Sequence, residues 1–279
     1  TGCDRRLSDS ARGRGAAPPG VCSSDHARTG PLHRGPRFHT RGLAGVVEPI
    51  VTARRAIASL ILALLLGFGE TGLAGAREAS GGAIELPEPK RDGEVSVESA
   101  LARRRSIREF AAEPVPLAAL SQLLWAAQGI TAPEGLRTAP SAGALYPLEV
   151  YLVVGEATGL SPGVYHYDPP RHRLLPHVTG DVRSALADAA LEQEWVAEAP
   201  ALLVLTAAHR RTARKYGRRA PRYVNMEVGH AAQNVYLQAV ALDLGTVMVG
   251  AFRDREIKRV LQLPTHLEAL GVMPVGKPR

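Results

Sequence analysis

Apolar residues follow helical spacing in two long segments of the chain. Pro116 and Gly129 enclose a segment in which leucines recur every three to four positions, so a helix is predicted between them. A longer helix is predicted from Tyr223 to Leu244, with Gly245 as its stop signal. This second segment is apolar on nearly every side, which is typical of a central or interface helix.

Two shorter helices are also predicted. Ser96 can cap one that ends near Ala102. Its apolar side consists of Val97, Ala100 and Leu101. The other is predicted as a capped helix over residues 254–261.

Predicted strands alternate with these helices. Residues 201–206 are continuously apolar, which is the pattern of a strand buried on both faces. A hairpin is expected where Tyr165-His166-Tyr167 and Arg173-Leu174-Leu175 flank a turn with two prolines. Further strands are predicted at 150–154, 246–252 and 272–276. Helices and strands interleave without a repeat of fixed period, so the sequence indicates an α+β or α/β class.

The first 76 residues differ in composition from the rest of the chain. Residues 1–50 are rich in Gly, Arg, Pro and Ser and have no apolar periodicity. This favours either a disordered tail or upstream, non-native sequence before a start at a valine near Val46, Val47 or Val51. Residues 51–76 show the order of a secretory signal peptide: an arginine pair, a short apolar stretch and a small-residue site. Cleavage would leave residues 77–279 as one domain.

The signal peptide predicts export, to the bacterial periplasm. The pair Arg54-Arg55 also raises a twin-arginine route for folded proteins, although Ala58 departs from the usual apolar pair. The apolar stretch is shorter than the roughly 20 residues that span a bilayer, so no stable membrane insertion is expected after cleavage. The alternatives are a buried core helix or an uncleaved anchor, and the protein would be cytoplasmic if the signal is not used.

The net charge of +7 arises mainly from this N-terminal part. The first 76 residues hold ten Lys and Arg against five Asp and Glu, whereas the remainder holds 24 against 22. A nucleic-acid partner is therefore not indicated. Both cysteines, Cys3 and Cys22, also lie in the N-terminal part, which excludes thiol chemistry from residues 77–279. The nine histidines show no metal-ligand spacing, so no metal site is predicted.

Three segments could carry chemistry. Residues 103–108 read Arg-Arg-Arg-Ser-Ile-Arg, which is typical either of a phosphate clamp or of a solvated basic helix end. Residues 137–147 contain small residues that let backbone approach a flat ligand, or that form a plain turn. Residues 247–252 combine a strand end with Gly-Ala, where backbone N–H groups can meet a ring system or the chain can bend tightly.

Taken in this order, with Gln233-Asn234 inside the long helix, these segments resemble the FMN-dependent nitroreductase family. Three phrases are similar to its SagB-type or ThcOx-type dehydrogenase branch: Tyr165-His166-Tyr167, the stretch 227–234, and Pro274-Val275-Gly276. The resemblance covers residues 86–279. It implies a three-layer α+β fold, with a mixed central sheet flanked by helices, and an intertwined homodimer with two FMN sites at its interface.

The resemblance also assigns roles by position. The FMN-binding residues that it implies are Arg104, Arg105, Ser106, Arg108, Pro140, Ser141, Gly143, Gly250, Ala251 and Lys277. The first four would hold the phosphate and ribityl chain, and the next three would lie along the flavin from the other subunit. Gly250 and Ala251 would face the ring where relatives outside the branch have Glu-Gly. Lys277 would reach the phosphate from the C-terminal end.

Lys215 and Tyr216 match a Lys-Tyr pair that serves as general base in azoline-oxidising relatives. Either residue could act in this way if its pKa were lowered by burial or by neighbouring cations. Five arginines surround the pair, and such a run of charges is equally typical of a solvated helix and loop.

The resemblance implies an FMN-dependent oxidoreductase that passes hydride from NADH or NADPH to a small organic acceptor, nitroaromatic or quinone-like, by a ping-pong scheme. A first alternative is an azoline-to-azole peptide dehydrogenase that uses Lys215 and Tyr216, although the export signal argues against it. A second alternative is a non-catalytic flavin-binding protein of the cell envelope.

Overall fold

The computed structural model describes residues 81–279, which fall in one compact unit. The predicted tail or upstream sequence (1–50) and the predicted signal peptide (51–76) lie outside the described residues. No helix of the described part is both long and apolar enough to cross a membrane.

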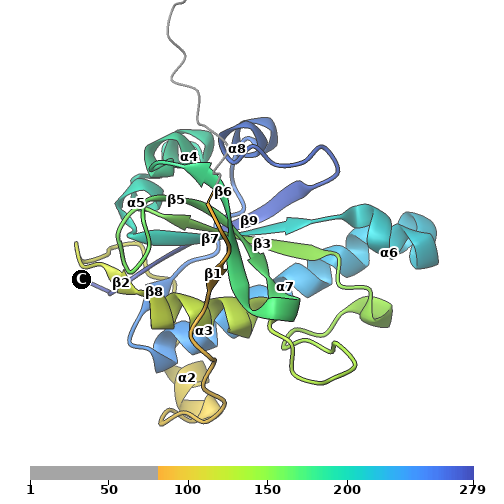
Figure 1. Ribbon diagram of the computed structural model, residues 1–279, viewed down its shortest axis with the longest axis horizontal. Coiled ribbons are helices and arrows are strands. Elements are labelled where there is room, and N and C mark those ends of the chain that lie inside the picture. Colours follow the sequence, from red (N-terminus) through yellow and green to blue (C-terminus); the bar gives the residue numbers. More distant parts are fainter. Residues whose placement is uncertain (1–80) are drawn as a thin grey trace, which may run out of the picture. The chain divides into compact units, whose positions relative to one another are not determined.

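A seven-stranded sheet forms the centre of this unit (Figure 1). In spatial order its strands are β1 (Ile84–Glu85), β6 (Arg173–Thr179), β5 (Gly163–Asp168), β3 (Leu148–Val154), β7 (Ala201–Ala207), β9 (Glu268–Gly276) and β8 (Gly245–Thr246). All pairings of these named strands are antiparallel. A parallel bridge joins Ser106 to Thr246 at the edge, and two short parallel strands, β2 (Val115–Pro116) and β4 (Ala157–Thr158), lie apart. The sheet is therefore mainly antiparallel.

The middle strand β7 confirms the prediction made from its continuous apolar sequence. Every residue of β7 is buried, and the strand pairs with β3 on one side and β9 on the other. Successive side chains of a strand point to opposite faces, and Leu203 joins one apolar cluster while Leu202 and Val204 join another. The sheet therefore separates two hydrophobic cores.

Helices cover both faces of the sheet, which gives the three layers expected of the fold (Figure 1). On one face the core includes α3 (Leu117–Gln128) and α7 (Ala220–Ala241). On the other face it includes α4 (Arg183–Ala189), α5 (Glu194–Glu198) and α8 (Asp254–Val260). The predicted helix between Pro116 and Gly129 and the predicted hairpin, seen as β5 and β6 joined by η2 (Pro169–Arg171), are confirmed.

The short helix α2 (Val97–Arg103) begins as predicted but does not bury the predicted side. Ser96 caps it, because its Oγ accepts a hydrogen bond from the Ser99 N–H at 3.1 Å. Val97 is 63% exposed and Leu101 is 52% exposed, and Ala100 is the one buried residue of the helix. The apolar side that the sequence predicts is therefore mostly exposed in this chain.

The end of the long helix α7 differs from the prediction. The helix spans residues 220–241 rather than 223–244, and the chain turns at Asp243, whose φ of +53° is left-handed. Gly245 does not stop the helix but lies in β8. Helix α8 begins at the predicted Asp254, but Arg253 before it forms no side-chain cap.

The predicted strand over residues 246–252 was too long, and the last predicted strand was too short. Past Thr246, residues 247–252 form one further bridge, between Val249 and Val272. The reason lies in the Met248 N–H, which donates to the Tyr236 hydroxyl at 2.8 Å instead of to a neighbouring strand. Strand β9 begins at Glu268, four residues before the predicted start at Val272.

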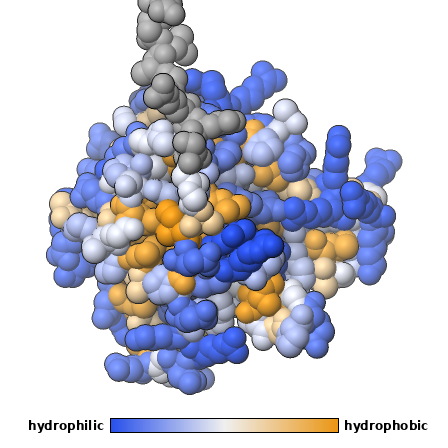
Figure 2. All heavy atoms as spheres, viewed as in Figure 1, coloured by the Kyte–Doolittle hydropathy of each residue, from blue (hydrophilic) through white to orange (hydrophobic). Residues whose placement is uncertain are grey.

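Helix α6 (His209–Tyr216) and the turn η3 (Gly217–Arg219) connect β7 to α7. This connection is rich in cations and projects beyond the sheet (Figure 1). Figure 2 shows hydrophilic side chains over the region in which α6 lies. Thr212 is the buried residue of α6, so the helix packs with one narrow side.

Candidate functional site

The arginine-rich segment after α2 lies along the edge of the sheet. The Ile107 N–H donates to the Thr246 carbonyl at 3.0 Å, and Ser106 forms a parallel bridge with Thr246. A Cβ on Gly245 would lie 2.7 Å from the Ile107 Cβ, so this close pairing requires glycine at position 245. Because the segment is extended here, successive side chains are expected to point to opposite sides.

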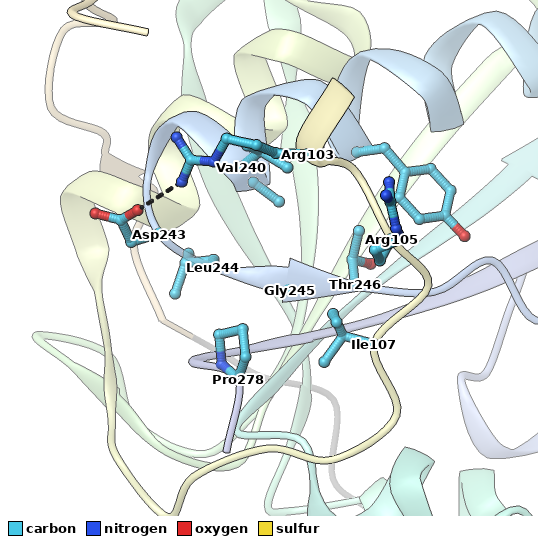
Figure 3. A pocket seen from close by; sticks show the side chains of 11 residues that line it. Arg103, Arg105, Ile107, Val240, Asp243, Leu244, Gly245, Thr246 and Pro278 are labelled. Atoms are coloured by element: carbon cyan, nitrogen blue, oxygen red, sulfur yellow. Dashed lines mark hydrogen bonds and ion pairs between the residues drawn. The ribbon is translucent and has the colours of Figure 1, made fainter. Parts of the chain in front are cut away.

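On one side, Arg103, Arg105 and Ile107 line a cavity of about 210 Å³ beside the end of α7 (Figure 3). Nη2 of Arg103 pairs with Oδ1 of Asp243 at 3.3 Å, and this ion pair is exposed. Nη1 of Arg105 donates to the carbonyl oxygens of Ala102 and Arg104, at 3.0 and 2.8 Å. Arg105, a predicted phosphate ligand, is thus engaged with the C-terminal end of α2.

Arg104 and Arg108 are not part of that cavity lining, and each lies over an aromatic ring. The Arg104 guanidinium is 5.2 Å from the centre of the Tyr236 ring, and the Arg108 guanidinium is 5.7 Å from that of Trp195. The Ser106 Oγ lies 3.2 Å from the Tyr236 hydroxyl. Neither arginine forms an ion pair with a carboxylate among residues 81–279, so both charges can meet an anion.

The predicted ring-facing residues Gly250 and Ala251 belong to the same region. Nε2 of Gln193, directly before α5, donates to the Ala251 carbonyl at 2.9 Å. The same helix carries Trp195, on which Arg108 stacks. Gly250 is exposed, and a Cβ placed on it would meet no heavy atom within 4 Å. The structure thus brings Arg108 and an open stretch of backbone to one helix.

Lys277 lies near the end of this segment but is paired with an acid. Its Nζ is 3.1 Å from Oε2 of Glu113, and both side chains are more than half exposed. Its carbonyl accepts from the Ala111 N–H at 2.8 Å. An exposed ion pair of this kind contributes little stability, so it does not exclude a phosphate from Lys277.

The second predicted group, Pro140 to Gly143, is held by helix α7. The Ser141 hydroxyl donates a short hydrogen bond to Oε2 of Glu227 and accepts one from the Tyr146 N–H at 2.9 Å. Nδ1 of His230 lies 3.3 Å from the Pro140 carbonyl oxygen. These contacts attach the start of the loop to one turn of the helix.

Lys215 and Tyr216 reach the other end of this loop. Gly143, in the 3-10 turn η1 (Ala142–Ala144), has a left-handed φ of +65°. A Cβ on Gly143 would lie 3.0 Å from Nζ of Lys215 and 2.9 Å from the Tyr216 hydroxyl. The predicted general base, Lys215 and Tyr216, and the predicted flavin loop are therefore neighbours. Because Gly143 has no side chain, the space between them stays open.

No hydrogen bond or ion pair of the described part joins this loop to the segment 104–108. The loop contacts α7 at Glu227 and His230, and the segment contacts it at Tyr236. At a rise of about 1.5 Å per residue, Tyr236 lies roughly 9 to 13 Å from the other two along the helix. One chain therefore presents the predicted residues as two groups.

Glu227 is the most buried acid near the loop, with 2% of its surface exposed. Burial raises its pKa to about 7, against the opposing influence of the Ser141 hydrogen bond and of the Arg137 and Arg211 charges. Its second oxygen, Oε1, has no hydrogen-bond partner among the described residues. Burial also lowers the pKa of Arg137, whose Nη1 donates to Oε1 of Gln128 at 2.7 Å.

Glu149 in β3 has the opposite electrostatic balance. Burial would raise its pKa, but the hydrogen bond with His166, 2.8 Å long, and the contact with Arg211 outweigh burial and lower it. Arg211 also donates to the Tyr146 carbonyl at 2.9 Å. Arg211 therefore forms its ion pair with Glu149 and not with Glu227.

The sequence profile of the nitroreductase family matches residues 101–277, which include both groups of predicted site residues. The chain belongs to the nitroreductase family. Members of this family are oxidoreductases, and this chain is therefore one. A Methanocaldococcus jannaschii protein that carries the nitroreductase name is 47% identical over 194 residues, which are 70% of this chain and 96% of that protein.

Solved structures agree with this family assignment. A nitroreductase-named structure from Ralstonia eutropha is 31% identical, with a TM-score of 0.62 over 74% of this chain and 95% of the other. One from Anabaena variabilis is 28% identical, with a TM-score of 0.59 over 66% of this chain and 38% of the other. The nitroreductase fold is therefore shown for residues that include the sheet and both helical layers.

The close contact between Gly245 and Ile107 predicts that a side chain at position 245 destabilises this edge of the sheet. A Gly245→Ala substitution forces the segment 104–108 away from β8, because the new Cβ would overlap Ile107. We expect a loss of about 1–3 kcal/mol in the free energy of unfolding, measured by urea denaturation. Gly229→Ala in α7 is the matched control, since a Cβ there meets nothing within 4 Å. Equal stability of the two variants would contradict the role of Gly245.

Sequence reasoning missed Glu227, Arg137 and Tyr236 as parts of these groups. The hydrogen-bond partner of Glu227 is a serine hydroxyl from a distant part of the sequence. A usable signal was its place three residues after Val224 and four before Ala231, both buried, which puts a carboxylate on the buried side of a helix. No comparable local pattern marks Arg137 or Tyr236.

Proposed function

We propose that this nitroreductase-family oxidoreductase binds FMN and uses NADH or NADPH to reduce a small organic acceptor, such as a nitroaromatic or a quinone. The observation that carries the proposal is that Arg104 and Arg108 form no ion pair with a carboxylate in the described part, and that Arg108 lies over Trp195 of α5, the helix whose start also binds the open backbone at 250–251. When bound, FMN would supply the hydride chemistry, receiving a hydride from the nicotinamide and passing it to the acceptor in a second half-reaction.

The chain's own residues fit such a cofactor. Two guanidinium groups without carboxylate partners suit a phosphate, because their planar forks match its oxygens. The Ser106 hydroxyl adds a donor or acceptor beside them. The exposed backbone at Gly250 leaves room for a flat ring to approach. These residues would bind and orient the cofactor.

We place the complete site between two copies of the chain. The loop 140–143 and the segment 104–108 form separate groups on α7, and a second subunit could bring one group to the other. Exposed apolar side chains on α2 and α7, Val97, Leu101 and Met226, provide surface for such a homodimer. Export to the periplasm belongs to the same proposal and rests on the sequence of residues 51–76.

An absorbance spectrum of the purified chain tests the proposed function. Bound oxidised flavin is expected, with bleaching by NADH or NADPH under anaerobic conditions and recovery on addition of a quinone or nitroaromatic. A protein that binds no flavin on reconstitution with FMN would overturn the proposal. Bound flavin that dithionite bleaches but that never turns over would instead indicate a non-catalytic flavin-binding protein.

A second candidate function is the oxidation of peptide azolines to azoles. It is favoured by Nζ of Lys215 and the Tyr216 hydroxyl, which lie at the open position of Gly143. A trifolitoxin-processing protein of Rhizobium leguminosarum is 31% identical over 142 residues, which are 49% of this chain and 38% of that protein. The chain thus spans well under half of that relative.

Substitution of the Lys-Tyr pair separates the two functions. If the pair is a general base, Lys215→Ala and Tyr216→Phe are expected to slow oxidation of a synthetic thiazoline peptide by about 100-fold or more. Quinone reduction by NADH should change by only a few-fold, because it needs no base at this position. Arg218→Ala in η3 is the control for loss of a neighbouring exposed cation. Equal losses in both assays would count against a specific role as base.

A further inference from the structure

We propose that a cavity on the α8 face of the sheet binds a small phenol, that is, a flat apolar ring that carries a hydroxyl group. The cavity has a volume of about 330 Å³. This volume lies within the range of small-molecule pockets, about 300–1,000 Å³. Strands β3, β5 and β6 and the segment between α8 and β9 line it. The inference does not depend on the proposed function, because the cavity needs no flavin.

The cavity is separate from the candidate flavin site. The segment 104–108 bridges to β8, whereas the cavity lies over β3, β5 and β6. Strands β7 and β9 lie between β3 and β8, so at about 4.8 Å per strand the two regions are at least about 14 Å apart. The loop 140–143 is held by α7, and Tyr151 of the cavity belongs to the core on the opposite face. None of the predicted FMN-binding residues lines the cavity.

Three rings form one wall of the cavity. The centre of the Tyr151 ring lies 5.0 Å from that of His166 and 5.1 Å from that of His177. Tyr151 of β3 is directly opposite His166 of β5 in the sheet, so both side chains are on the same face. Leu175 and Leu267 add apolar side chains to the lining. Such walls suit the body of a flat apolar ring.

Each of these two histidines has one engaged ring nitrogen and one free ring nitrogen. Nε2 of His166 is 2.8 Å from Oε2 of Glu149, and Nε2 of His177 is 3.0 Å from the Leu261 carbonyl oxygen. A carbonyl and an ionised carboxylate only accept, and Glu149 is kept ionised by its contact with Arg211, so each Nε2 carries the hydrogen. Nδ1 of each neutral ring is then an acceptor, and neither Nδ1 has a hydrogen-bond partner in the described part.

The Tyr151 hydroxyl adds a hydrogen-bond donor to the same cavity. Tyr151 is 3% exposed, yet its hydroxyl forms no hydrogen bond among residues 81–279. Burial, together with the charge of Glu149, raises the pKa of Tyr151 to about 12, so the hydroxyl keeps its proton at neutral pH. A buried polar group without a partner is costly, and an oxygen atom of a ligand would satisfy this one.

A phenol supplies what these groups need with a single atom. Its O–H can donate to an imidazole Nδ1, and its oxygen can accept from the Tyr151 hydroxyl. A carboxylate would bring no hydrogen to Nδ1 and would add a second negative charge near Glu149. A plain hydrocarbon ring would leave the two nitrogens and the hydroxyl without partners.

Calorimetric titration of the purified chain with p-cresol and with 4-methylanisole tests the proposal. The two compounds differ by a methyl group on the oxygen, so 4-methylanisole cannot donate a hydrogen bond. We expect p-cresol to bind at least about 10-fold more tightly, with the same Kd in the presence and absence of saturating FMN. Equal affinity for the two compounds, or loss of p-cresol binding when FMN is added, would overturn the proposal.

Two substitutions assign the binding to this cavity. Tyr151→Phe removes one hydroxyl and should raise the Kd for p-cresol about 3- to 10-fold, and His177→Phe should raise it at least about 10-fold. Tyr165→Phe is the matched control with an unchanged Kd, because the Tyr165 hydroxyl donates to the Ser161 carbonyl at 2.7 Å and the residue belongs to the other core. An unchanged Kd in Tyr151→Phe and in His177→Phe would contradict the assignment.

Nitrogen-15 NMR of the imidazole rings gives a readout that needs no change in affinity. Saturating p-cresol should shift the Nδ1 signal of His166 or His177, because that nitrogen accepts a new hydrogen bond, and 4-methylanisole should not. Comparison with the spectrum of His177→Phe identifies the His177 signal. If His177→Phe does not fold, Tyr151→Phe and the spectrum of the unsubstituted chain still decide the matter. Imidazole signals that stay in place at saturating p-cresol would show that the phenol binds elsewhere.

Discussion

The Arg104→Ala, Arg108→Ala double variant is expected to lose its FMN during purification, while the unsubstituted chain keeps it. A hydrogen bond to a charged partner contributes about 1.5–3 kcal/mol, so the removal of two such donors costs about 3–6 kcal/mol of binding free energy. This corresponds to a Kd roughly 100- to 10,000-fold higher. Both arginines rest on aromatic rings rather than on carboxylates, so their loss leaves no buried acid unpaired.

The matched control is the Arg255→Ala, Arg259→Ala double variant, which removes two cations from α8. It should keep a flavin-to-protein ratio equal to that of the unsubstituted chain. Arg105→Ala should have a smaller effect than either single variant at 104 or 108, because Arg105 donates to the end of α2. A normal flavin ratio in the Arg104, Arg108 variant would remove the phosphate role from this segment.

Elements whose residues are buried on a regular spacing could be predicted from the sequence. Strand β7 is apolar at every position except Thr206, because both of its faces are covered, and α3 repeats leucine on the side that meets the sheet. The hairpin of β5 and β6 carries its own turn. In each case the cause is local, so a short window of sequence contains it.

Elements set by distant contacts could not be predicted in this way. The segment 104–108 pairs with β8, about 140 residues later in the chain, and the strand predicted after Thr246 ends because Tyr236 takes the Met248 N–H. The long helix ends where Asp243 adopts a left-handed conformation, which aspartate tolerates and which no apolar pattern marks.

The residues of the candidate site show the same difference between local signals and distant contacts. Arg104, Ser106 and Arg108 were predicted because guanidinium groups at high density are a local signal for phosphate. Arg105 points to the other side of the segment because the segment is extended where it pairs with β8, a contact that is distant in sequence. The bond between Ser141 and Glu227 joins residues 86 positions apart, so neither residue alone indicated it.

The stability of the chain should depend on the ionisation of Glu227, with a sign opposite to that of most acids. Its pKa is about 7 in the folded chain and near 4.5 when unfolded, so the folded state binds more protons between these values. The stabilisation that the protonated Glu227 gives to the folded state is therefore complete below pH 4.5 and is lost as the pH rises through 7. The difference amounts to about 3 kcal/mol in the free energy of unfolding.

Urea denaturation of the unsubstituted chain and of Glu227→Gln between pH 4.5 and 8 isolates this contribution, because all other groups are shared. We expect Glu227→Gln to gain stability relative to the unsubstituted chain as the pH rises, by up to about 3 kcal/mol at pH 8. Glu149→Gln should show the opposite trend, and only when the denaturation series is extended below pH 4.5. His166 and Arg211 outweigh burial and lower the pKa of Glu149, so its carboxylate stabilises the fold above pH 4.5 and that benefit is lost as the pH falls through the lowered value. A flat difference for Glu227→Gln would mean that the buried acid is ionised at neutral pH, and that Arg137 or solvent compensates its charge.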